Sequence, residues 1–149
     1  MTNSFISFIF GTVVFVLLGC SGRQVLKLRE GVNEEAKDLT ASIIWIKNKR
    51  DSVDIKIKLF NGYTHPVHVN RSSFKMTFNG RHGNLNEDSL EIALGSKEFK
   101  EQYLMFRFTE EIPAAGDAVF TIDPIYSGMS SEGDKTKMPK YTRTVNFGG

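Results

Sequence analysis

Apolar and polar residues alternate with a period of two through most of the chain after residue 38. From Val53 to Leu59 every second residue is apolar, and Asp54, Lys56 and Lys58 lie between them. This alternation is typical of a β-strand with one face buried and the other exposed to water. Further runs with the same period lie at residues 74–78, 90–94, 104–108, 118–122 and 141–147.

Two segments depart from strict alternation but still favour strands. Residues 39–46 are apolar on both faces and include Trp45, which predicts a central strand, and a shorter extended segment surrounds Val67 and Val69. Only residues 30–38 have helical character, and they predict a single turn at most.

Turn residues separate these runs. Asn79-Gly80 is the strongest hairpin signal in the chain, because both residues tolerate a positive φ. Asn61-Gly62, Gly83-Asn84 and Gly95-Ser96 predict further turns. The sequence therefore predicts an all-β domain, an antiparallel immunoglobulin-like sandwich of seven to eight strands, with a β-barrel as the alternative.

The first twenty residues have a different pattern. Residues 5–20 are almost entirely apolar, and no charged side chain precedes Arg23. As a helix these residues would reach roughly 24 Å at about 1.5 Å per residue, whereas a bilayer core is about 30 Å thick. The segment therefore fits the apolar region of a signal peptide better than a permanent span, although its start lacks the usual Lys or Arg.

The sole cysteine of the chain, Cys20, directly follows this segment. The sequence Leu17-Leu18-Gly19-Cys20 resembles the lipobox of bacterial lipoproteins. The resemblance implies that residues 1–19 are a cleaved signal peptide and that Cys20 becomes the lipidated first residue of the mature protein. Residues 20–37 would then form a tether and residues 38–149 the sandwich domain. The alternative is an ordinary signal peptide or signal anchor with an incidental cysteine.

The same resemblance bears on location. In two-membrane bacteria an Asp after the lipidated Cys resembles a signal for retention in the inner membrane. This chain has Ser21 there, so the resemblance implies the outer membrane, with the domain facing the periplasm. In a one-membrane bacterium the same anchor would mean the outer face of the plasma membrane.

Composition fits a globular domain of about 130 residues, which is long enough for a core. Hydrophobic residues make up 40% of the chain, and the net charge of +2 is too small to indicate a nucleic-acid partner.

Chemistry-bearing residues are sparse. His65 and His68 invite a metal-site hypothesis, with His82 as a third ligand, but a spacing of three puts the first two on opposite faces of a regular strand. No Gly-x-Ser-x-Gly elbow or phosphate-binding loop is present. We therefore predict neither an enzyme nor a cofactor.

Two segments are candidates for partner contact. Lys49 and Arg50 belong to a basic hairpin tip that would suit anionic lipid headgroups or an acidic partner. Residues 127–140 predict a long polar loop in which Met129 and Met138 could adapt to a partner surface. The simpler alternatives are a solvated turn and a loop without a role.

Residues 55–80 are similar to small immunoglobulin-like domains of desiccation-related proteins and envelope lipoproteins, through Ile55–Asn61, Pro66–Val69 and Phe74 to Asn79-Gly80. We use that similarity for the fold alone. The function predicted is a lipid-anchored binding or assembly accessory of an envelope complex, since the layout resembles secretion-system lipoproteins and pilotins. The alternatives are a ligand- or metal-binding stress-protective lipoprotein and a lipid-anchored hydrolase.

Overall fold

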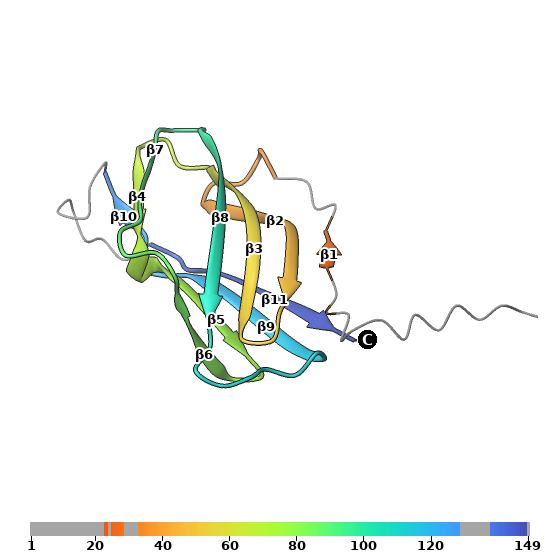
Figure 1. The fold of residues 1–149 in the computed structure, drawn as a ribbon. Coiled ribbons are helices and arrows are strands. Elements are labelled where there is room, and N and C mark those ends of the chain that lie inside the picture. Colours follow the sequence, from red (N-terminus) through yellow and green to blue (C-terminus); the bar gives the residue numbers. More distant parts are fainter. Residues whose placement is uncertain (1–22, 24, 29–32, 129–137, 149) are drawn as a thin grey trace, which may run out of the picture.

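The computed structural model describes residues 23, 25–28, 33–128 and 138–148. Cys20 and Met129 lie outside this part of the chain. Eleven strands form an eight-stranded sheet and a three-stranded sheet, and every strand pairing is antiparallel. The larger sheet folds over on itself into two layers (Figure 1). The prediction of an all-β antiparallel sandwich is confirmed.

The first layer has the strand order β1-β2-β3-β8. Its strands are β1 (Val25–Lys27), β2 (Leu39–Asn48), β3 (Ser52–Asn61) and β8 (Phe99–Arg107). In Figure 1 β2, β3 and β8 run side by side, with β1 at the outer edge of β2. Buried and less buried residues alternate over residues 55–59 of β3 and 103–107 of β8, because side chains on successive residues point to opposite faces of a strand.

The second layer has the order β6-β5-β9-β11. It contains β5 (Phe74–Phe78), β6 (Arg81–Leu85), β9 (Gly116–Ile122) and β11 (Tyr141–Phe147). Taking β2, β3, β5, β6, β8, β9 and β11 as strands A to G, the sheet reads A-B-E-D-C-F-G, which is the strand order of an immunoglobulin constant-type domain with strand D linking its A-B-E and C-F-G groups. β6 pairs with both β5 and β8 and so joins the layers.

The small three-stranded sheet has the order β10-β4-β7 and lies at one end of the sandwich (Figure 1). Its strands are β4 (Val67–Asn70), β7 (Glu91–Leu94) and β10 (Tyr126–Ser127). The 3-10 helix η1 (Arg71–Ser73) connects β4 to β5. This sheet closes the end of the core opposite the β2–β3 hairpin.

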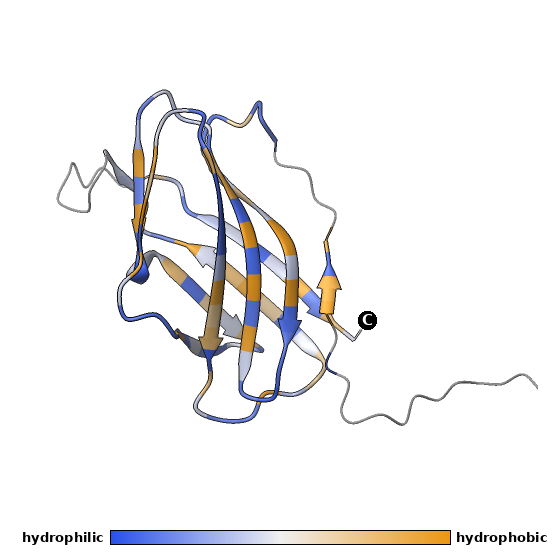
Figure 2. Ribbon diagram, turned by 45° about the horizontal axis from the view of Figure 1, so that its top comes forward, coloured by the Kyte–Doolittle hydropathy of each residue, from blue (hydrophilic) through white to orange (hydrophobic). Residues whose placement is uncertain are grey.

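The core lies between the two layers and consists of aliphatic side chains around a group of phenylalanines. Phe120 is 1% exposed, and its ring centroid lies 6.2 Å from that of Phe74 and 6.2 Å from that of Phe106. Such aromatic contacts add to the free energy gained by burying apolar surface. Figure 2 shows the resulting alternation of hydrophobic and hydrophilic positions along β3.

Most strand predictions are confirmed, and so is the hairpin signal. Asn79 and Gly80 connect β5 to β6 with φ angles of 48° and 80°. Positive φ at both positions is what a two-residue type I′ turn requires.

The predicted turn at Gly83-Asn84 is wrong, because both residues lie inside β6. A Cβ atom on Gly83 would lie 2.8 Å from the Phe108 ring, so glycine here makes room for a core aromatic side chain. Glycine inside a strand often marks such a close approach.

The predicted tether and helical turn also differ from the structure. Val25–Lys27 pairs with β2, and Leu26 packs against the core, so part of the expected tether belongs to the sheet. Residues 33–38 form turns and bends. The barrel alternative is not realised either, because β1 and β11 end the large sheet without pairing to each other in the described residues.

Candidate functional site

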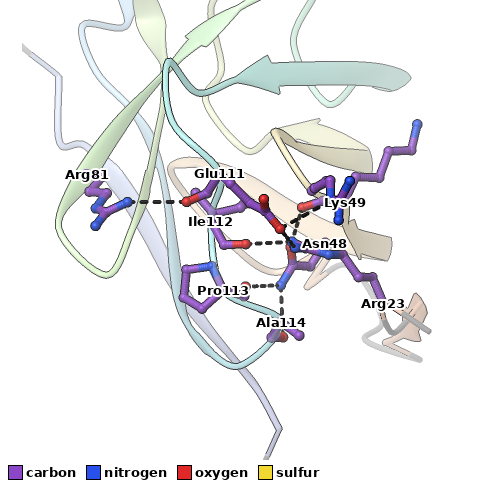
Figure 3. A network of polar contacts seen from close by, with 9 residues as sticks. Arg23, Asn48, Lys49, Arg81, Glu111, Ile112, Pro113 and Ala114 are labelled. Atoms are coloured by element: carbon purple, nitrogen blue, oxygen red, sulfur yellow. Dashed lines mark hydrogen bonds and ion pairs between the residues drawn. The ribbon is translucent and has the colours of Figure 1, made fainter. Parts of the chain in front are cut away.

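The N-terminal end of the described chain is fastened to the domain by Arg23. Its Nη1 atom donates to Asn48 Oδ1 at 3.2 Å, to the Lys49 carbonyl and to the Ile112 carbonyl at 2.7 Å (Figure 3). Its Nη2 atom forms an ion pair with Glu111 at 3.2 Å. The Arg23 side chain is 12% exposed, so it is enclosed between the β2–β3 hairpin and the 108–115 segment.

Asn48 connects the Arg23 side chain to the 108–115 segment. It is fully buried, and its Nδ2 atom donates to the carbonyls of Pro113 and Ala114, both at 2.9 Å (Figure 3). The side-chain amide thus satisfies backbone groups that the sheet leaves unpaired, as buried polar groups require. We call Arg23, Asn48, Glu111 and Ile112 the anchor clamp.

The two predicted contact residues of the hairpin tip both form ion pairs within the domain. Arg50 Nε lies 3.2 Å from Glu111 Oε1, and Lys49 Nζ lies 2.5 Å from Asp54 Oδ2. Arg81 forms a similar pair with Glu110 at 3.5 Å. The tip is therefore largely neutralised by its own carboxylates, and contact between Lys49 or Arg50 and a partner stays a prediction.

A larger basic surface lies on the first layer, on the side facing away from the core. Trp45 opposes Lys56, and Lys56 opposes Tyr103 across β2, β3 and β8. We define this outer face by ten side chains: Lys27, Trp45, Lys47, Lys49, Asp54, Lys56, Lys58, Glu101, Tyr103 and Met105.

A β-bulge puts Trp45 on the outer face. Ile43 opposes Ile57 and points into the core, and the register shifts by one residue before Trp45 opposes Lys56. A bulge redirects side chains in this way because it adds one unpaired residue to the strand. The ring of Trp45 then lies 5.8 Å from that of Tyr103.

Asp54 is unusual for an outward-pointing residue because it is only 3% exposed. Lys49 covers one carboxylate oxygen, and Oδ1 has no hydrogen-bond partner among the described atoms. Burial and the neighbouring Asp54 carboxylate raise the pKa of Tyr103. The hydrogen bond to Asp54 likewise raises the pKa of Lys49, so both neighbours stay protonated at neutral pH.

We expect the two halves of the Lys49–Asp54 pair to contribute unequally to stability. Lys49→Met should lower the free energy of unfolding by about 1–2 kcal/mol, since it leaves a buried carboxylate without its partner. Asp54→Asn should cost less, because the Lys49 side chain is 38% exposed and water can solvate it. Urea unfolding of both variants measures the difference, and an equal or reversed cost would contradict it.

The same pair predicts a loss of stability in alkali. Because folding raises the pKa of Lys49, its contribution is complete below the unfolded lysine pKa and disappears as pH rises through the folded value. Lys49→Met should therefore show a flatter decline in melting temperature above about pH 10 than the wild type. Parallel declines would rule out this contribution.

The three histidines do not assemble into one site. His65 precedes β4 and lies 5.1 Å from the Tyr63 ring, whereas His68 is buried in β4 with Nε2 against Glu91. His82 lies on β6. Among the described residues, no three His, Cys, Asp or Glu side chains come close enough to hold a metal ion. The metal hypothesis gains no support from this geometry.

An open hollow of about 800 Å³ lies where β5 and β6 diverge. Their pairing ends at Met76 and Gly83, and η1 and the segment before β7 form the other walls. Its lining is mixed: Arg71, Lys75 and His82 contribute basic groups, and Asp88 and Glu91 contribute carboxylates. This is a concave surface of the size of a peptide or small-ligand site.

The two predicted contact residues of the 127–140 loop are Met129 and Met138. Met129 lies outside the described residues. Met138 is 8% exposed and belongs to the core, so its side chain packs inside the domain and does not face a partner. In the part of the chain that the structure describes, no helix is long and apolar enough to cross a membrane.

Sequence reasoning missed both the anchor clamp and the outer face. The available signals were Arg23 as the first charged residue of the chain and the lysines between the apolar positions of β3.

Comparison with known proteins adds little. No protein-family model matches the chain, and no curated protein does. Among solved structures the chain is similar to YcdA from Bacillus subtilis subsp. subtilis str. 168, provisionally described as a lipoprotein, with 14% identity and a TM-score of 0.46. The match covers 77% of this chain and 40% of YcdA, so the chain spans well under half of that protein. A likeness this distant assigns no family.

Proposed function

We propose that this protein is a bacterial lipoprotein, held at a membrane by lipid on Cys20, and that its sandwich domain acts by binding an envelope protein rather than by catalysis. The observation that carries the proposal is the anchor clamp. Arg23 is fastened to the domain by its hydrogen bonds to Asn48, Lys49 and Ile112, and Cys20 lies only three residues before it.

The clamp makes the proposed tether very short. Three residues span at most about 11 Å when fully extended. A lipid joined to Cys20 through a thioether would therefore hold the sandwich against its membrane. The tether predicted from the sequence, residues 20–37, would instead have been a stalk of 18 residues. A free lipid-anchored linker of that length would leave the domain far more freedom.

Ser21 favours the outer membrane as the location, with the domain facing the periplasm. For the partner we favour the hollow between β5 and β6, because it is concave and combines apolar walls with both signs of charge. Phe74 and Leu90 line the hollow but are only 4% and 9% exposed, so its accessible polar groups, such as Arg71 and Asp88, would make most of the contact. Interfaces commonly combine these features.

The anchor is tested by comparing full-length wild type with Cys20→Ala in cells, with Ser21→Ala as the matched control. We expect wild type and Ser21→Ala to fractionate with membranes and to incorporate labelled fatty acid. Cys20→Ala should lose the label, and no processed form of it should fractionate with membranes. Equal labelling of Cys20→Ala would overturn the anchor.

The hollow is tested by in-cell crosslinking and capture of the anchored protein. Ser89→Trp fills the hollow, and Thr144→Trp adds the same bulk on the exposed face of β11 as a control. We expect Ser89→Trp to lose captured envelope proteins while Thr144→Trp retains them. Capture that is unaffected by Ser89→Trp would move the partner surface elsewhere.

The ligand-binding alternative predicts a concave site with aromatic or histidine lining, and the hollow contains Phe74 and His82. A wild-type protein that is membrane-bound but captures no protein would favour this alternative. Titration of the purified protein with Zn²⁺ and with glycan fragments would then identify the ligand class.

A further inference from the structure

We propose that the outer face of the first layer rests on the membrane surface and binds anionic lipid headgroups. This inference depends on the proposed lipid anchor at Cys20, and it adds a second, protein-based contact with the same bilayer. The contact surface is the sheet face of β1, β2, β3 and β8, and from the β2–β3 hairpin tip it includes only Lys49, whose side chain lies against Asp54.

The first argument is charge. The outer face carries five lysines and only two carboxylates, and those two are already paired, Asp54 with Lys49 and Glu101 with Lys56. Lys27, Lys47 and Lys58 have no ion-pair partner among the described residues. Since the whole chain has a net charge of only +2, its excess positive charge is concentrated here. Lysines near an anionic leaflet are attracted to its headgroups.

The second argument is the apolar content between these lysines. Trp45 and Tyr103 lie next to each other at the centre of the face, and Tyr103 is 41% exposed. Val25 and Phe99, at its edges, are 48% and 37% exposed. Tryptophan and tyrosine favour the headgroup level of a bilayer, and lysine stems lie along apolar surface while their ammonium groups stay in water.

The third argument is reach. Val25 lies five residues after Cys20 and on the same sheet, so the edge of the outer face is within about 18 Å of the lipidated residue. The other surface within reach is the end of the sandwich around the anchor clamp. There Glu111 pairs with Arg23 and Arg50, and Glu110 pairs with Arg81. An anionic bilayer therefore favours the outer face over that end.

The experiment uses Trp45, which is the only tryptophan of the chain and lies on the outer face. The lipidated mature protein, which begins at Cys20 in this proposal, is reconstituted into phosphatidylcholine vesicles with or without phosphatidylglycerol. Both kinds of vesicle contain lipids with brominated acyl chains. We expect Trp45 emission to fall about two-fold in the anionic vesicles, because an indole at headgroup level meets the quenching bromines. Raising the salt concentration should restore the emission, because it screens the lysine charges.

Two matched double variants separate the face from total charge. Lys47→Glu with Lys58→Glu reverses charge on the outer face, and Lys75→Glu with Lys140→Glu makes the same change elsewhere. The first should abolish lipid quenching of Trp45, and the second should retain it. Circular dichroism establishes that each variant is folded.

Vesicle flotation distinguishes the lipid anchor at Cys20 from the proposed contact between the outer face and the membrane. If the wild type floats but Trp45 is reached by aqueous acrylamide and not by brominated lipid, the membrane-facing surface is overturned while the anchor stands. If quenching is equal with and without phosphatidylglycerol, the electrostatic basis is overturned. If the wild type fails to float, the anchor fails, and this inference fails with it.

Discussion

Arg23→Ala is expected to lower the free energy of unfolding by about 2–3 kcal/mol. The guanidinium group donates to Asn48 Oδ1 and to the carbonyls of Lys49 and Ile112, and it forms an ion pair with Glu111. Alanine removes all of these contacts and leaves half-buried carbonyls without a donor. Urea or thermal unfolding of the purified protein measures the loss.

Two controls separate the clamp from an ordinary surface charge. Arg50→Ala removes the second partner of Glu111, and because its side chain is 76% exposed we expect a loss below about 0.5 kcal/mol. Arg23→Lys should recover little, since a single ammonium group cannot reproduce the planar set of donors. If Arg23→Ala were as mild as Arg50→Ala, the short tether would lose its basis.

Gly62→Ala is expected to cost about 3 kcal/mol or more, because it forces overpacking against the backbone. A Cβ atom at Gly62 would lie 2.1 Å from the Ala36 carbonyl oxygen and 2.6 Å from the Asp38 carbonyl oxygen. Neither atom can move as a side chain can, and the Gly62 amide also donates to Asp38 at 3.0 Å. To make room for the added methyl group, the segment before β2 and the end of β3 would have to move apart.

Gly95→Ala is the matched control for this substitution. The nearest atom to a Cβ there is the flexible Glu98 carboxylate at 3.2 Å, so we expect a change below about 1 kcal/mol. Chemical unfolding of the two variants compares them directly. Similar losses at the two glycines would mean that residues 36–38 do not pack against β3 as described.

The strands that could be predicted from sequence are those whose apolar positions alternate over five or more residues. β3, β5, β7, β8, β9 and β11 follow this pattern, and β2 and β4 were also predicted, from their apolar residues. β6 could not be predicted, because Arg81–Leu85 has one buried residue and a glycine whose role depends on the Phe108 ring. β1 is too short for a periodic signal, although Leu26 reaches the core.

The candidate site was harder to predict, for a physical reason. The anchor clamp joins residues 23, 48 and 112, which are far apart in the chain and meet only through the fold. The outer face depends on a bulge that turns Trp45 away from the core, and alternation alone would have put it inside. Cys20 could be proposed from sequence because the lipobox is a local motif.

The central claim is that lipid on Cys20 holds this domain at a membrane, and the intact mass of the protein purified from membranes tests it most directly. The account predicts a chain that begins at Cys20 and carries the added mass of a diacylglyceryl group, and fragmentation would locate that mass on Cys20. A chain cleaved at another residue, or one that begins at Cys20 with no added lipid, would contradict it.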